Sequence, residues 1–118
     1  MFGLGELEAE AMEQLWSSTD KLSVHDLVDR LSTSRQLAYT TVLTVVTHLH
    51  QKGWVEREKR QRAYFYYPSR TREEAVFSAV RAMLDSIDDS AAVLELLGPT
   101  LNQAEFTALT RGWARRVS

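Results

Sequence analysis

The chain has 118 residues, which is the size of one domain or of one compact module with a small appendage. It contains no cysteine, which excludes disulfides, thiolate metal sites and cysteine nucleophiles, and its net charge of −2 does not by itself indicate a polyanionic partner. No segment approaches the roughly 20 consecutive apolar residues of a membrane span, so we expect a cytoplasmic protein without a membrane segment.

The chain begins with two amphipathic helices. Residues 6–16 predict the first helix, because apolar residues recur there at helical spacing and acidic residues occupy its first turn. Its apolar stripe consists of Leu7, Ala11, Leu15 and Trp16. Residues 21–22 are compatible with a very short strand. Ser23 followed by Asp26 predicts an N-cap for a second helix over residues 24–31.

Residues 37–53 predict the third helix, which ends at a glycine able to take the left-handed conformation. Its core face consists of Ala38, Tyr39, Val42, Val45, Val46 and Leu49. Its opposite face is uncharged and consists of Thr40, Thr44, Thr47 and Gln51, with Thr41 and His48 at the edges. Threonine lowers helix propensity, so another demand must favour it here. A DNA major groove supplies such a demand, because short hydroxyl side chains reach base edges; the alternative is a solvated, threonine-rich face.

Two runs of aromatic and β-branched residues, 54–59 and 63–68, predict a β-hairpin with Arg60 and Arg62 at its tip. The connection contains neither glycine nor asparagine, which leaves the turn type open. The aromatic residues expected in the core are Trp16, Trp54, Tyr64 and Tyr66, and those expected to point outward are Phe65 and Tyr67.

Basic residues are concentrated around the third helix and the hairpin. Residues 35–72 carry eight basic residues against two acidic ones, a net charge of +6. Residues 1–34 have a net charge of −5 and residues 73–118 a net charge of −3. This segregation is expected of a module that places one face against phosphates.

Three helices followed by a two-stranded hairpin is the order of a winged helix-turn-helix domain. In that fold the third helix enters the major groove, and the hairpin, or wing, lies along the backbone or reaches a minor groove. The threonines would then read bases, while Arg57, Lys59, Arg60 and Arg62 would supply the attraction to phosphates, with Arg60 and Arg62 as phosphate or minor-groove contacts.

The rest of the chain predicts helices over residues 71–87, 90–97 and 101–116, all with apolar surface. Fewer than fifty residues cannot easily form an independent core, so we expect a second copy of the chain to cover this surface. The predicted dimer interface consists of Val80, Met83, Leu84, Ile87, Val93, Leu97, Leu109 and Trp113. An intramolecular core is the alternative. The predicted organisation is a mainly α chain, with a winged-helix domain over residues 1–70 and a three-helix dimerisation region over residues 71–118.

Three segments carry a family resemblance: LGELEAEAMEQLW, AYTTVLTVVTHLHQKGWVEREKR and AYFYYPSRTREEA. They resemble the penicillinase repressor family of bacteria, the BlaI/MecI group, over residues 4–75 and more loosely towards the C-terminus. The resemblance implies a homodimeric winged-helix transcriptional repressor that binds a palindromic operator and dimerises through its C-terminal helices. Together with the residue patterns, it gives a set of expected DNA-binding residues: Arg35, Tyr39, Thr40, Thr41, Thr44, His48, Arg60 and Arg62.

Two features of the family are missing from this chain. Members released by a membrane sensor-protease system are cleaved at an Asn-Phe bond, and this chain has no Asn-Phe dipeptide. The resemblance therefore implies a sensor-protease partner without a matching cleavage site. Copper-responsive relatives carry a C-terminal cysteine cluster, which is also missing here.

Neither catalysis nor metal binding is expected. The sequence has no glycine-rich phosphate loop and no nucleophile placed beside a base, so we expect no enzyme and no cofactor. His48 and His50 are two residues apart on a helix and cannot face one metal ion. A winged-helix module that binds proteins through Phe65, Tyr67 and the C-terminal apolar surface is the alternative function.

Overall fold

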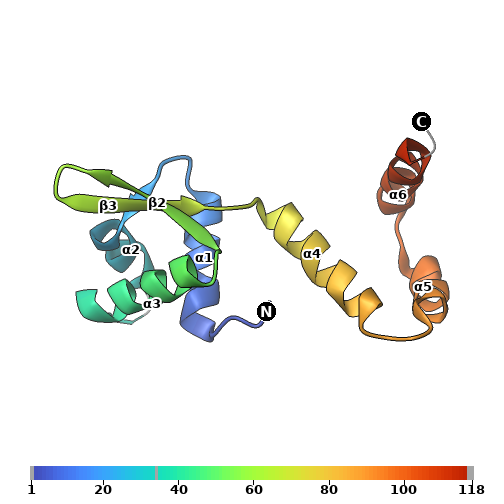
Figure 1. Ribbon diagram of the computed structural model, residues 1–118, viewed down its shortest axis with the longest axis horizontal. Coiled ribbons are helices and arrows are strands. Elements are labelled where there is room, and N and C mark those ends of the chain that lie inside the picture. Colours follow the sequence, from blue (N-terminus) through green and yellow to red (C-terminus); the bar gives the residue numbers. More distant parts are fainter. Residues whose placement is uncertain (1, 34, 117–118) are drawn as a thin grey trace. The chain divides into compact units, whose positions relative to one another are not determined.

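The computed structural model describes residues 2–33 and 35–116 (Figure 1). Its elements are α1 (Glu6–Ser17), β1 (Leu22–Ser23), α2 (Val24–Leu31), α3 (Tyr39–Gln51), β2 (Val55–Arg60), β3 (Ala63–Pro68), α4 (Arg72–Asp85), α5 (Ser90–Leu97), the 3₁₀ helix η1 (Gly98–Thr100) and α6 (Gln103–Arg115). The chain divides into two compact units, Met1–Ala79 and Val80–Ser118, so α4 contributes to both. Each unit is described by itself.

The predicted helices are confirmed, with differences of one or two residues at several ends; the third runs from Tyr39 to Gln51 rather than over residues 37–53. The second helix has the predicted bounds, because the Ser23 hydroxyl accepts from the Asp26 amide at 3.1 Å and the Asp26 carboxylate accepts from the Ser23 amide at 2.9 Å. The last helix begins at Gln103 rather than residue 101, because Asn102 caps it by accepting from the Glu105 amide at 2.8 Å. At its C-terminal end α4 stops at Asp85, two residues before the predicted end.

The predicted hairpin is confirmed and forms the main part of a three-stranded antiparallel sheet with strand order β1-β3-β2. The register pairs Arg60 with Ala63, which leaves a two-residue turn. Gln61 in this turn has a φ of 57°, a left-handed conformation that costs an L residue about 1–2 kcal/mol.

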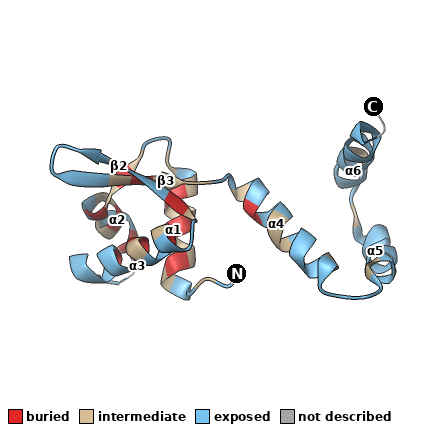
Figure 2. Ribbon diagram, viewed as in Figure 1, coloured by how far each residue is buried: buried red, intermediate tan, exposed pale blue. Residues whose placement is uncertain are grey.

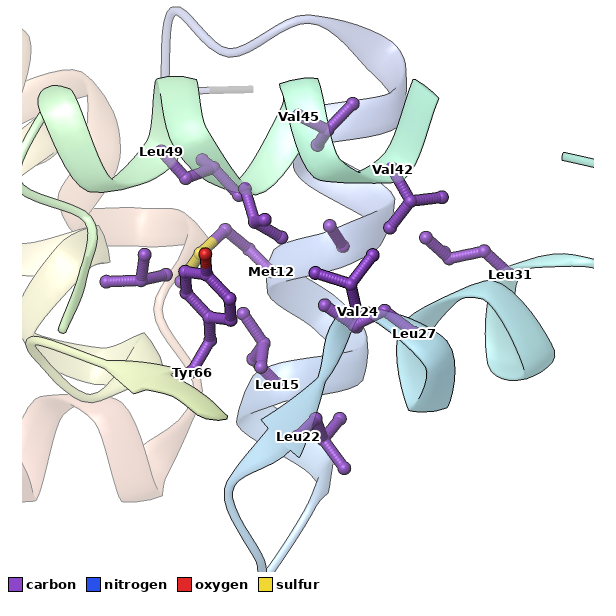
Figure 3. Close-up of a cluster of buried hydrophobic side chains, with 13 residues drawn as sticks. Met12, Leu15, Leu22, Val24, Leu27, Leu31, Val42, Val45, Leu49 and Tyr66 are labelled. Atoms are coloured by element: carbon purple, nitrogen blue, oxygen red, sulfur yellow. The ribbon is translucent and has the colours of Figure 1, made fainter. Parts of the chain in front are cut away.

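One hydrophobic core holds the first unit together (Figure 3). It draws on all three helices and the sheet: Ala11, Met12, Leu15, Leu22, Val24, Leu27, Leu31, Val42, Val45, Val46, Leu49, Val55 and Tyr66. Tyr66 of β3 points toward Met12 and Leu15 of α1, which joins the sheet to the helices. Trp16 and Trp54 are half-buried and pack against this core.

Three residues predicted to lie in the core are exposed, because each lies at or near the end of its helix or strand, beyond the core residues of that element. Ala38 and Tyr39 are exposed because they begin α3, and the Tyr39 ring contacts His25 instead, with ring centroids 4.6 Å apart. Tyr64 is 40% exposed because it lies near the turn of the hairpin. Conversely, Phe65 and Tyr67, predicted to point outward, are half-buried: the Arg60 guanidinium lies 4.9 Å from the Phe65 ring centre, and the Lys21 ammonium 4.5 Å from that of Tyr67.

The second unit forms no such core. Among its described residues, 80–116, none is buried, as the pale surface of α5 and α6 shows (Figure 2). Leu84 is half-buried, and the other predicted dimer residues are exposed by 41 to 69%: Val80, Met83, Ile87, Val93, Leu97, Leu109 and Trp113. The apolar side chains predicted here therefore do not cover one another within this unit.

No described helix combines the length and the apolar character that crossing a bilayer requires.

Candidate nucleic-acid interface

The outer face of α3 is exposed over most of its length, and Thr47 on this face is half-buried (Figure 2). Thr40, Thr41, Thr44 and His48 are all exposed, as the sequence predicts for a helix that buries Val42, Val45, Val46 and Leu49 on its opposite side. The face carries no charged side chain apart from any charge on His48. It presents small polar groups that can approach another surface closely.

The threonine hydroxyls on this face differ in how they are bonded. Thr44 Oγ1 donates to the Thr40 carbonyl at 3.0 Å, and Thr47 Oγ1 donates to the Leu43 carbonyl at 2.7 Å. Among the described residues, the hydroxyls of Thr40 and Thr41 have no hydrogen-bond partner. The hydroxyl protons in the first turn of α3 are therefore free, and those further along it are used within the helix.

Leu43 is a residue of this face that the sequence reasoning missed. Its side chain is 38% exposed. It follows Thr40 by three residues and precedes Thr47 by four, so helical spacing alone could have placed it beside the threonines.

Carboxylates hold four of the eight basic residues between residues 35 and 72. The ion pairs are Arg35 with Glu10 and, at 3.8 Å, Glu6; Lys52 with Glu8 at 2.9 Å; Arg60 with Glu58 at 3.2 Å; and Arg72 with Glu13 at 2.7 Å. Within the described part of the chain, Arg57, Lys59, Arg62 and Arg70 have no carboxylate within 4.0 Å. Arg70 donates to the Ser78 hydroxyl, so the other three, all on the hairpin, are the cations most available to a ligand.

Two of these hairpin cations share an aromatic support. The Arg57 guanidinium lies 4.3 Å from the centre of the Tyr64 ring and the Lys59 ammonium 6.0 Å from it. Cations over a ring face are held in place without losing their charge. The sequence reasoning placed Arg60 and Arg62 at the tip. The structure shows that Arg60 is engaged by Glu58, whereas Arg57 and Lys59 are not paired with a carboxylate.

Ion pairs with α1 fix α3 near both of its ends. At the C-terminal end, the Lys52 ammonium lies 2.9 and 3.0 Å from the two carboxylate oxygens of Glu8, and the Gly5 amide donates to the same carboxylate at 2.9 Å. These bonds lower the pKa of Glu8, the Gly5 amide most and Lys52 next. Before the N-terminal end, Arg35 is bound to Glu10. The orientation of α3 is thus tied to that of α1.

The hairpin is also tied to the body of the first unit by charge. Lys21, which precedes β1, donates to Glu58 of β2 at 2.9 Å, and this bond is the main cause of the lowered pKa of Glu58. Among the described residues, no group of three histidine, aspartate or glutamate side chains is arranged to hold a metal ion.

The model of the penicillinase repressor family matches residues 4–114 of the chain. The chain belongs to the penicillinase repressor family. Over 89 residues it is 38% identical to the transcriptional regulator BlaI from two strains of Mycobacterium tuberculosis, a match that covers 75% of this chain. The match spans 64% of the length of these relatives. Both relatives are named as transcriptional regulators, and the family model is named for a repressor.

Similar solved structures confirm that this member of the penicillinase repressor family has a winged-helix fold. The transcription regulator MepR from Staphylococcus aureus matches with a TM-score of 0.53 at 16% identity, over 98% of this chain and 79% of that one. A MepR-DNA complex matches with a TM-score of 0.51 at 18% identity, over 85% and 83% of the two chains. Streptococcus pneumoniae FabT, solved with DNA, matches with a TM-score of 0.51 at 14% identity, over 98% and 74%.

Proposed function

We propose that this protein is a cytoplasmic, DNA-binding transcriptional repressor that acts as a homodimer on a palindromic operator. The observation that carries the proposal is the pairing, within one unit, of an exposed, acid-free face of α3 with a hairpin that holds three cations without carboxylate partners. In the proposed complex α3 enters the major groove, and the hairpin lies along the phosphate backbone.

Base reading and phosphate binding fall to different residues in this proposal. Tyr39, Thr40, Thr41, Thr44 and His48 face the groove from α3. Arg57, Lys59 and Arg62 contact phosphates, because none of the three is neutralised by a carboxylate. Arg35 and Arg60 would contribute to DNA binding by exchanging Glu10 and Glu58 for a phosphate.

The proposed homodimer follows from the exposed apolar surface of residues 80–116. Water-exposed leucine, methionine and tryptophan side chains in this number favour association through a closed, twofold interface. A twofold dimer would present two copies of α3 to half-sites about 34–36 Å apart on one face of the duplex.

The alternative of a protein-binding module has less support. It relied on Phe65 and Tyr67 pointing outward and on the C-terminal apolar surface. That surface is exposed, but both rings are half-buried beneath cations. No Asn-Phe dipeptide is present, so we propose no cleavage by a sensor-protease system at such a bond.

A salt titration tests DNA binding without knowledge of the operator. The purified protein is titrated into a fluorescent duplex of mixed sequence, first at low salt and then at rising salt concentrations. Six cations, three from each protomer, predict that log K falls with log salt with a slope of about −5. A slope near zero, or no binding at low salt, contradicts the proposal. Footprinting over the DNA upstream of the gene then tests for an operator with two inverted half-sites.

A further inference from the structure

Beyond its first turn, the outer face of α3 has two threonine hydroxyls, and both already donate their protons within the helix. A threonine hydroxyl has one proton to donate and two lone pairs that accept. Thr44 and Thr47 donate their protons to the carbonyls four residues earlier, at 3.0 and 2.7 Å. What these side chains offer a ligand is therefore an acceptor oxygen and a methyl group, and no proton.

Leu43 adds apolar surface to the same part of the helix. It is 38% exposed and adjoins Thr44 in sequence, and its carbonyl accepts the Thr47 hydroxyl. We call Leu43, Thr44 and Thr47 the methyl patch. The exposed part of Leu43 offers carbon atoms against which an apolar group of a ligand can pack.

The major groove contains one base with an apolar group. Thymine displays its C5-methyl there, and the adenine paired with it displays an N6 amino donor, whereas guanine presents only the acceptors N7 and O6. The methyl patch matches A·T pairs, since its carbon atoms can pack against the thymine methyl and its free lone pairs can accept from adenine. Its lone pairs alone do not distinguish A·T from G·C, because cytosine also presents an amino donor, N4; the thymine methyl group is therefore what sets the preference.

Resting on the proposed DNA-binding function, we propose that the methyl patch selects operator positions by contact with thymine methyl groups. The three hairpin cations make a DNA duplex the occupant of this face, because their charge complements phosphate. Thr40 and Thr41 keep free hydroxyl protons and play a different part, as donors to base or phosphate acceptors.

The test compares thymine with deoxyuridine, which lacks only the methyl group. A duplex that the protein selects from a random pool is synthesised twice, once with thymine and once with deoxyuridine throughout, and both are titrated at one salt concentration. Each contacted methyl should contribute about fourfold in affinity, the worth of one buried carbon. Equal affinities overturn the inference and leave the proposed function standing. Failure to select any sequence, together with no binding at low salt, overturns the proposed function.

Substitutions at one position separate the methyl group from the hydroxyl. Thr44→Val keeps a methyl and removes the hydroxyl, so it should retain the thymine preference. Thr44→Ser keeps the hydroxyl and removes the methyl, so it should lower the preference by about fourfold for each half-site. The reverse order of the two variants overturns the inference. Thr110→Ser is the matched control, because its hydroxyl also donates to a helix carbonyl, at 2.8 Å, but lies on α6. Thermal unfolding of all variants checks that the fold is intact.

Discussion

The two units of the chain are built from similar amphipathic helices but bury them to different extents. In the first unit the apolar stripes of α1, α2 and α3 meet one another and the sheet in one core. In the second unit none of the described residues is buried. The comparison teaches that helical periodicity identifies the apolar face of a helix. It does not tell whether other residues of the same chain bury that face.

Charges show the same difference. In the first unit most ion pairs join residues far apart in the sequence, as Lys52 joins Glu8 and Arg72 joins Glu13; the pair of Arg60 with Glu58 within β2 is the exception among the described residues. In the second unit the described interactions are local, such as Arg81 with Asp85 one turn away in α4 and the Asn102 cap of α6. The first unit is thus held together by contacts between residues far apart in the sequence, and the proposed homodimer would supply such contacts to the second.

The largest expected effect tests the core of the first unit against the surface of the second. Leu27→Ala removes a fully buried side chain and should lower the free energy of unfolding by about 2–5 kcal/mol. Leu96→Ala, at a side chain that is 78% exposed, should change it by no more than about 0.5 kcal/mol. Urea unfolding measures both. Equal losses would mean that Leu96 is buried in solution, either in a core of the second unit or between two copies of the chain.

A charge placed in the second unit should act on assembly. Leu109→Glu puts a carboxylate into the proposed interface of α6 and should give a monomer in sedimentation, with operator affinity lowered by about 100-fold because two linked sites become one. Ala108→Glu, which adds the same side chain on a different side of the helix, should remain a dimer. A wild-type protein that sediments as a monomer at micromolar concentration would contradict the proposed homodimer.

The ion pair between α1 and α3 predicts a smaller, pH-dependent effect. Because the folded state lowers the pKa of Glu8, this group contributes stability above its ordinary pKa of 4.5 and loses that contribution as the pH falls below it through the lowered value. Glu8→Gln should cost about 1.5 kcal/mol at neutral pH and flatten this acid dependence. Glu10→Gln, at a more exposed pair, should cost less than about 1 kcal/mol. Unfolding curves measured over a series of pH values test this prediction. If Glu8→Gln loses stability at acid pH as steeply as the wild type does, Glu8 is not the source of the acid dependence.

The smallest expected effect concerns a single hairpin cation. Arg62→Gln should reduce the steepness of the salt dependence by about one for each bound protomer, because one phosphate contact is lost. Arg111→Gln removes the same charge from α6 and should leave the slope unchanged. If both variants lower the slope equally, overall charge and not the hairpin governs the attraction to DNA.

Local signals in the sequence predicted most of the fold. Ser23 followed by Asp26 marked the start of α2, and threonines opposite valines marked the exposed face of α3. The exposure of Tyr39 and Tyr64 was missed, because periodicity continues to the end of an element while the core beneath it does not. Tertiary structure also decides which cations stay free. Glu10 reaches Arg35 across 25 residues, a pairing that no local pattern indicates.

The left-handed residue in the hairpin turn has a consequence for the entropy of binding. Glycine would fit the φ of 57° at Gln61 without strain, but it would also allow the tip many more conformations. A side chain with a β-carbon narrows that range before any ligand arrives. The tip is thereby preorganised, and less conformational freedom is lost when Arg60 and Arg62 on either side of Gln61 become ordered against a rigid partner.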